Sequence, residues 1–176
     1  MGKGRQTNRK VNISSILFCI VFLFNHVGLA QKVESSAYQF MLNSLLSKKV
    51  PTVSVADIQP TVEIVWLDAR EKKEFEVSHL KDAIWVGYET FDLKNIQHLP
   101  KNSNIIVYCS VGYRSEKITE KLIDAGYVYT KNLFGGIFEW VNQNKPVFKE
   151  NITTNQVHAY SKTWGIWLHK GEKVFD

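Results

Sequence analysis

A short loop between an apolar run and an amphipathic run limits the possible folds of this chain most strongly. The apolar run at residues 105–108 is short and rich in β-branched side chains, which predicts a buried strand. Residues 115–125 carry apolar side chains at helical spacing and are followed by Gly126, which predicts a helix that ends there. A strand therefore leads into the loop 109–115, and this loop leads directly into a helix.

Cys109 is the first residue of this loop. Backbone N–H groups in a tight loop that precedes a helix point inward, and the helix adds the positive end of its dipole. Such a loop is expected to bind an anion, and a cysteine within it should ionise more readily than a free cysteine. Because the thiolate is the nucleophilic form of cysteine, Cys109 is the candidate catalytic residue.

The rest of the chain alternates short apolar runs with amphipathic segments. The predicted strands are residues 52–55, 63–67, 83–86, 105–108 and 128–133, and the predicted helices are residues 35–47, 115–125 and 137–142. The charged segment 71–76 is expected to form a short exposed helix or turn. This alternation predicts an α/β fold with a parallel sheet that helices cover on both faces.

Polar residues follow two of the predicted strands directly. Asp68 comes after the strand 63–67, and Cys109 comes after the strand 105–108. Because ligands bind at the carboxyl ends of parallel strands, we expect Asp68 and Arg70 to lie near the cysteine loop. Asp68 is then the expected partner of Arg114, the one cation in the loop.

The basic charge of the chain is concentrated at its N-terminus. Four of the 22 Lys and Arg residues lie in residues 1–30, which leaves 18 basic against 17 acidic residues in the remainder. This near-neutral remainder gives no reason to expect a nucleic-acid partner.

The same N-terminal segment has the pattern of an export signal. A basic stretch precedes an apolar run at residues 13–24 and small residues that end at Ala30. The run is shorter than the about 20 residues that span a bilayer, although an uncleaved anchor is the alternative. We expect cleavage near Ala30, a periplasmic or secreted protein, and no membrane contact after cleavage.

The chain contains two cysteines, Cys19 and Cys109, and Cys19 lies within the predicted signal. The mature chain would therefore carry Cys109 alone, and no internal disulfide could form. No second histidine or cysteine stands at ligand spacing from His79, so no metal is expected there. No cofactor is expected for this chain.

Several motifs, in one order along residues 53–147, resemble those of the rhodanese family of sulfurtransferases. These motifs are Leu67-Asp68-Ala69-Arg70, Glu74-Phe75, His79-Leu80, Ala83-Ile84, Val107-Tyr108-Cys109, Gly112, Arg114-Ser115, Asn132-Leu133, Gly135-Gly136 and Trp140. The resemblance implies a small three-layer α/β domain, with a central parallel sheet of about five strands flanked by helices.

The resemblance also implies a sulfurtransferase of the thiosulfate sulfurtransferase type. Cys109 would accept a sulfane sulfur from thiosulfate, polysulfide or a persulfide, and would itself become a persulfide. A thiol, cyanide or a protein acceptor would then take the sulfur away. The anion-binding loop would consist of Ser110, Val111, Gly112, Tyr113, Arg114 and Ser115, with Asp68 and Arg70 in support.

Some loop residues keep more than one interpretation. Arg114 either binds an anionic donor or only braces the loop, and Tyr113 either lines the mouth of the site or is a surface aromatic residue. Ser115 is expected to cap the following helix, and Gly112 is expected to let the backbone turn.

Two other functions stay open as alternatives. A phosphatase on the same fold would have one residue more between its cysteine and arginine than the four that separate Cys109 from Arg114, so this loop should be too tight for a phosphoryl group. A persulfide carrier without turnover, or an interaction module, is the second alternative. It would also hold sulfur on Cys109 but would not turn over small donors.

The chain is long enough for one domain with its own core, flanked by extensions. Neither a repeat nor a low-complexity tract is visible in the sequence. The expected division is a signal peptide at residues 1–30, an N-terminal helical extension at 31–52, a rhodanese-like domain at 53–148, and an aromatic-rich C-terminal tail at 149–176 that packs on the domain.

Overall fold

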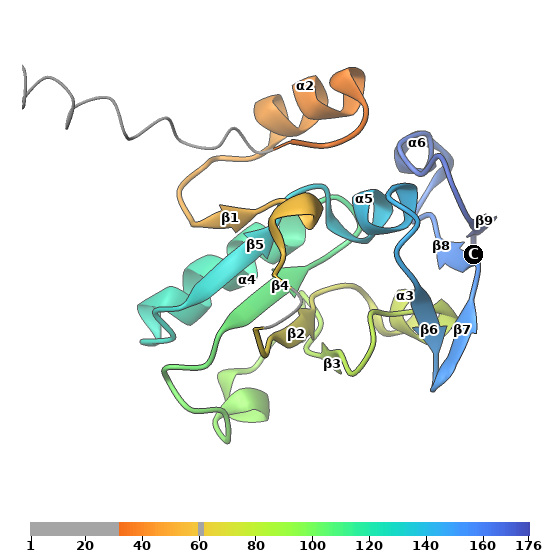
Figure 1. Cartoon of the computed structure of the whole chain (residues 1–176). Helices are drawn as coiled ribbons and strands as arrows, with labels where there is room; N and C mark the ends of the chain where they lie inside the picture. Colours follow the sequence, from red (N-terminus) through yellow and green to blue (C-terminus); the bar gives the residue numbers. More distant parts are fainter. Residues whose placement is uncertain (1–31, 60–61) are drawn as a thin grey trace, which may run out of the picture. The chain divides into compact units, whose positions relative to one another are not determined.

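The computed structural model describes residues 32–59 and 62–176. Within them, five strands form a sheet in the order β1-β5-β4-β2-β3 (Figure 1). These strands are β1 (Thr52–Val53), β2 (Val65–Asp68), β3 (Ile84–Trp85), β4 (Ile105–Tyr108) and β5 (Thr130–Leu133). Each pairing in this sheet is parallel. The predicted α/β fold with a parallel sheet is therefore confirmed.

The central strand β4 is buried along its whole length and contributes to two hydrophobic cores. Ile105 and Val107 pack in one core with apolar side chains of α4 (Tyr113–Asp124). Ile106 and Tyr108 point to the opposite face of the sheet, because successive strand side chains alternate. There they pack with residues from α2 (Ser36–Leu45) and α5 (Gly136–Asn142). Helices thus cover both faces, which gives three layers.

The charged segment after β2 forms the helix α3 (Lys72–Val77). The side chains of Glu71 and Glu74 close a reciprocal capping box at its first turn. The expectation that this whole segment is exposed is wrong for Glu74, whose side chain is fully buried. Glu74 can be buried because its carboxylate accepts hydrogen bonds from the cysteine loop.

The C-terminal residues form several short elements. These elements are the antiparallel pair β6 (Val147–Lys149) and β7 (Ile152–Thr154), the parallel pair β8 (Gln156–His158) and β9 (Glu172–Val174), and the helix α6 (Lys162–Gly165). Two 3-10 turns, Val55–Asp57 and Leu93–Ile96, complete the elements of the described residues.

Asn142 at the end of α5 fixes the last part of the chain. Its side-chain amide donates to Trp167 O at 2.9 Å and accepts from His169 N–H at 2.7 Å. The Trp167 ring in turn stacks on the Tyr38 ring of α2, with 5.3 Å between the ring centroids. These contacts bring the segments on either side of residues 53–143 together over α5.

The predicted export signal, residues 1–30, and Cys19 lie outside the described residues. None of the helices that the structure describes is long and apolar enough to cross a membrane. Cys109 is a free, buried cysteine.

Candidate active site

The cysteine loop, residues 109–115, joins the end of β4 to the first turn of α4. Gly112 precedes the helix with a φ of 120°, a backbone conformation that glycine adopts readily, so the expected turn at Gly112 is confirmed. The Gly112 N–H donates a hydrogen bond to Cys109 Sγ at 3.1 Å. The loop therefore presents a preorganised backbone donor to the sulfur, which favours negative charge there.

The amino end of α5 holds the loop from the opposite side. Ile137 N–H donates to Cys109 O at 2.9 Å, and Phe138 N–H donates to Ser110 O at 3.1 Å. These bonds fix the two loop carbonyls toward α5. Gly136 permits this approach, because a Cβ atom at that position would lie 2.3 Å from Cys109 O.

Arg114 and Glu74 form a two-pronged ion pair beside the cysteine. Arg114 Nη1 lies 2.6 Å from Glu74 Oε2, and Nη2 lies 2.8 Å from Oε1. Ser110 joins them, since its hydroxyl donates to Glu74 Oε1 at 3.0 Å and accepts from Arg114 Nη2 at 2.9 Å. This network fastens the loop to α3, so the geometry gives Arg114 a bracing role.

Both members of this pair stay charged over a wide range of pH. Burial by itself would raise the pKa of Glu74, but the hydrogen bonds and charge of Arg114 and the charge of Arg70 lower it below its ordinary value. Burial would likewise lower the pKa of Arg114, yet the hydrogen bonds to Glu74 and the nearby Cys109 and Glu74 raise it. The guanidinium also lies over the ring of Tyr160, at 4.9 Å from its centroid.

The expected pair between Asp68 and Arg114 does not form. Asp68 instead binds Arg70, with Arg70 Nη2 2.6 Å from Asp68 Oδ2 and both side chains fully buried. The same Nη2 donates to Ser78 O at 2.6 Å, and the guanidinium lies 5.6 Å from the centroid of the Tyr108 ring. Asp68 does end its strand in register with Tyr108, the residue before Cys109. Both oxygens of the Asp68 carboxylate accept hydrogen bonds from Arg70, only two residues away. Asp68 therefore has no free oxygen with which to pair with Arg114.

Ser115 does not cap α4, contrary to expectation. Gly112 occupies the cap position, and Ser115 lies two residues inside the helix that begins at Tyr113. The Ser115 hydroxyl donates to Asn132 Oδ1 at 2.7 Å, and Asn132 Nδ2 donates to Gly112 O at 3.0 Å. Ser115 therefore ties the loop to β5 through a buried amide.

A pocket of about 370 Å³ opens at Cys109. It is lined by Leu45, Cys109, Ser110, Val111, Tyr113, Arg114, Tyr160 and Trp164. Five of the seven predicted loop residues are among these eight, whereas Gly112, Ser115, Asp68 and Arg70 are not. Tyr113 lines the pocket although its side chain is 43 % exposed, so it lies at the mouth.

Three pocket residues and one buried carboxylate were not predicted from the sequence. Leu45 comes from α2, whereas Tyr160 and Trp164 come from the C-terminal tail. The aromatic content of the tail was visible in the sequence, but nothing in it specified contact with Cys109. Glu74 was visible only as one acid within a charged run.

The part of the chain that the structure describes holds no group of three or more His, Cys, Asp or Glu side chains that could bind a metal ion. The thiol of Cys109 lines the pocket, and the Gly112 N–H donates to its sulfur. Arg114, whose charge is balanced by Glu74, forms one wall.

Comparison with known proteins gives a consistent picture. The protein-family model of the rhodanese-like domain matches residues 53–143 of this chain. The chain is 32% identical over 142 residues to the adenylyltransferase and sulfurtransferase UBA4 of Meyerozyma guilliermondii, covering 72% of this chain and 33% of that protein. It is 33% identical over 85 residues to the tRNA uridine(34) hydroxylase of Wigglesworthia glossinidia brevipalpis, covering 46% of this chain and 27% of that protein. The chain thus spans about a quarter to a third of the length of these relatives.

A solved structure shares the architecture. The rhodanese-related protein of Thermoplasma volcanium matches with a TM-score of 0.52 at 25% identity, covering 57% of this chain and 99% of that one. The family model covers more than half of the chain, and it includes the strand, the cysteine loop and the helix that form the site. The chain belongs to the rhodanese-like domain family.

Proposed function

We propose that this protein is a sulfurtransferase that carries sulfane sulfur on Cys109. The observation that carries the proposal is the position of Cys109 Sγ, which accepts the Gly112 N–H at 3.1 Å and also lines a pocket. A nucleophilic thiolate needs a donor that favours its charge and a space in which the sulfur donor can approach. Sulfurtransferase activity is also part of the name of the UBA4 relative.

In the first step, the Cys109 thiolate attacks the sulfane sulfur of the donor. A bond forms between Cys109 Sγ and that sulfur, and the bond between the sulfur and the rest of the donor breaks, with its electron pair leaving on the donor fragment. Cys109 then holds a persulfide beside the Gly112 N–H. In the second step, a thiol, cyanide or protein acceptor attacks the outer sulfur, and the Cys109 thiolate leaves.

Mass spectrometry tests the proposal directly. The protein is incubated with thiosulfate, inorganic polysulfide or an organic persulfide, and the peptide that contains Cys109 is examined for one added sulfur atom. Loading of this peptide, and none of it in a Cys109→Ser variant, is the expected result. Failure of every donor to load Cys109 in a correctly folded protein overturns the proposal. Loading without release to any small acceptor identifies a persulfide carrier instead.

Export remains part of the proposal and is supported by the pattern of residues 1–30. To test whether residues 1–30 direct export and are removed, the full chain is expressed in a bacterial host and the N-terminus of the exported protein is sequenced. A mature chain that begins close to Gln31 is expected. A chain that stays uncleaved in the membrane fraction would identify an anchor.

A further inference from the structure

The pocket at Cys109 carries no net charge from its side chains. Arg114 is the one cation among its lining residues, and the carboxylate of Glu74 neutralises it at 2.6 Å and 2.8 Å. The Arg114 guanidinium therefore already has an anionic partner on two of its nitrogens. A Cys109 thiolate adds negative charge to the pocket and disfavours a second anion within it. Charge thus argues for an uncharged sulfur compound rather than a dianion.

The walls of the pocket are apolar and aromatic. Leu45, Val111, Tyr113, Tyr160 and Trp164 supply most of its lining, together with the hydroxyl of Ser110 beside Arg114. Such a surface stabilises apolar groups by removing them from water and offers an anionic group few hydrogen-bond donors. The volume of about 370 Å³ is sufficient for a small organic molecule.

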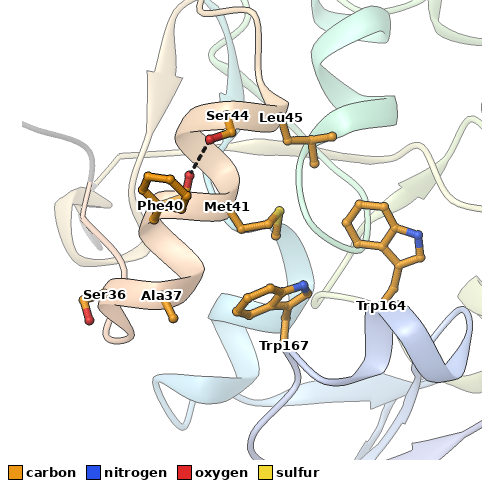
Figure 2. A pocket seen from close by; sticks show the side chains of 8 residues that line it. All are labelled: Ser36, Ala37, Phe40, Met41, Ser44, Leu45, Trp164 and Trp167. Atoms are coloured by element: carbon orange, nitrogen blue, oxygen red, sulfur yellow. Dashed lines mark hydrogen bonds between the residues drawn. The ribbon is translucent and has the colours of Figure 1, made fainter.

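A second apolar groove lies beside this pocket, along α2. We define the α2 groove by its lining residues, which are Ser36, Ala37, Phe40, Met41, Ser44, Leu45, Trp164 and Trp167. Its volume is about 800 Å³, and it shares Leu45 and Trp164 with the pocket at Cys109. Figure 2 shows Met41 and Leu45 pointing from α2 toward the rings of Trp167 and Trp164. Phe40, which also lines the groove, is 76% exposed.

We propose that the α2 groove binds the apolar substituent of an organic thiol or hydropersulfide whose sulfur reacts at Cys109. This inference rests on the proposed sulfur transfer and names the class of its substrate. The Cys109 thiolate attacks the outer sulfur of R–S–SH, a bond forms between the two sulfurs, and R–S⁻ leaves with the electron pair of the broken S–S bond. The reverse reaction loads an acceptor thiolate, and no external oxidant or reductant is needed in either direction.

Acceptor chain length is the first test. Cys109 is loaded with inorganic polysulfide, and the loss of its extra sulfur is followed by mass spectrometry with ethanethiol, butanethiol and hexanethiol. The second-order rate constant is expected to rise roughly two- to fourfold with each added methylene that enters the groove. 1-Propanethiol is expected to react faster than 3-mercaptopropionate, which has the same three-carbon chain ending in a carboxylate. Equal rates across both comparisons overturn the inference.

A second measurement does not depend on sulfur transfer. The rate at which Cys109 is alkylated by N-alkylmaleimides is compared for ethyl, butyl and hexyl substituents. A rate that rises with chain length supports the groove even where polysulfide fails to load Cys109, which would overturn the proposed function alone. Normal loading of Cys109, with thiol rates that do not rise with chain length, overturns the groove and leaves the proposed function standing.

Variants locate the effect in the groove. Leu45→Gln, at the wall shared with the pocket, and Phe40→Gln, at an exposed wall of the groove, are expected to reduce the preference for hexanethiol over ethanethiol by at least about threefold. Phe40 is exposed enough for its replacement to leave the fold intact. Tyr129→Gln is the matched control, because Tyr129 is 60% exposed and directly precedes β5 at the amino edge of the sheet. An unchanged preference in both groove variants contradicts the proposal.

Discussion

Arg114 and Glu74 face each other from the first turns of two different helices and join through two parallel hydrogen bonds. Arg114 is the second residue of α4, whereas Glu74 lies in α3, 40 residues earlier in the chain. Glu74 is fully buried and the Arg114 side chain is 13% exposed, so water weakens this pair little. The conformation of the cysteine loop therefore depends on a helix outside the strand–loop–helix unit that carries Cys109.

A double-mutant cycle tests the strength of this pair. Glu74→Gln is expected to lower the free energy of unfolding by about 3 kcal/mol, because it leaves the Arg114 guanidinium largely buried without a counter-charge. Arg114→Gln is expected to cost a similar amount. The double variant should cost about 1–3 kcal/mol less than the sum of the two, as urea denaturation would show. Strictly additive costs would mean that the two residues do not act together.

Glu76→Gln is the matched control for this cycle, since Glu76 is exposed on the same helix as Glu74. Its free energy of unfolding should stay within about 0.5 kcal/mol of the unaltered protein.

The stability of the protein should fall in acid because of Glu74. Its pKa is lowered from the ordinary value of 4.5, so the folded protein binds fewer protons at this carboxylate than the unfolded chain. The stabilisation is therefore present above about pH 4.5 and is lost as the pH falls through the lower folded pKa. Urea denaturation from pH 7 to pH 3 would measure this loss. Glu74→Gln should show a smaller loss over the same range, and an identical pH dependence would contradict the assignment.

Local patterns were sufficient to predict the sheet and the cysteine loop. Each central strand is a short apolar run, and Gly112 follows Cys109 at a position where the backbone must turn. These features depend on neighbours in the chain, so the sequence displays them directly. The burial of β4 on both faces is the reason its residues 105–108 lack alternating polarity.

The partners across the site depend on tertiary packing and could not be predicted in the same way. Asp68 and Arg114 were expected to pair because both lie beyond strand ends, but Arg70 is nearer to Asp68 along the chain and saturates it. Glu74 looked like an exposed acid because residues 71–76 are mostly charged. Its burial follows from the partner it meets, which lies 40 residues away.

The ion pair between Asp68 and Arg70 should support the fold rather than the chemistry. Asp68→Asn is expected to reduce the free energy of unfolding by about 3–5 kcal/mol, because it leaves a fully buried guanidinium without a counter-charge. Neither residue lines the pocket at Cys109. The folded fraction should therefore still load sulfur on Cys109, as measured by mass spectrometry below the melting temperature. A folded but unloadable variant would assign Asp68 a direct role in the reaction.

Lys73→Ala gives a contrast with this buried pair. Lys73 forms an ion pair with Asp176 at the surface, where both side chains are 58% exposed. Loss of this ion pair should therefore barely change the urea denaturation midpoint.

Gly136 should be indispensable for the shape of the cysteine loop. A Cβ atom there would lie 2.3 Å from Cys109 O and 2.6 Å from Ser110 O, so Gly136→Ala must push α5 away from the loop. We expect a loss of about 3 kcal/mol in the free energy of unfolding and slower sulfur loading of Cys109. Gly126→Ala measures the cost of a positive φ without a steric clash. Gly126 also has a positive φ, of 90°, but a Cβ atom there meets nothing within 4 Å. It should cost about 1 kcal/mol and leave loading unchanged. Equal effects of the two variants on loading would show that α5 does not shape the loop.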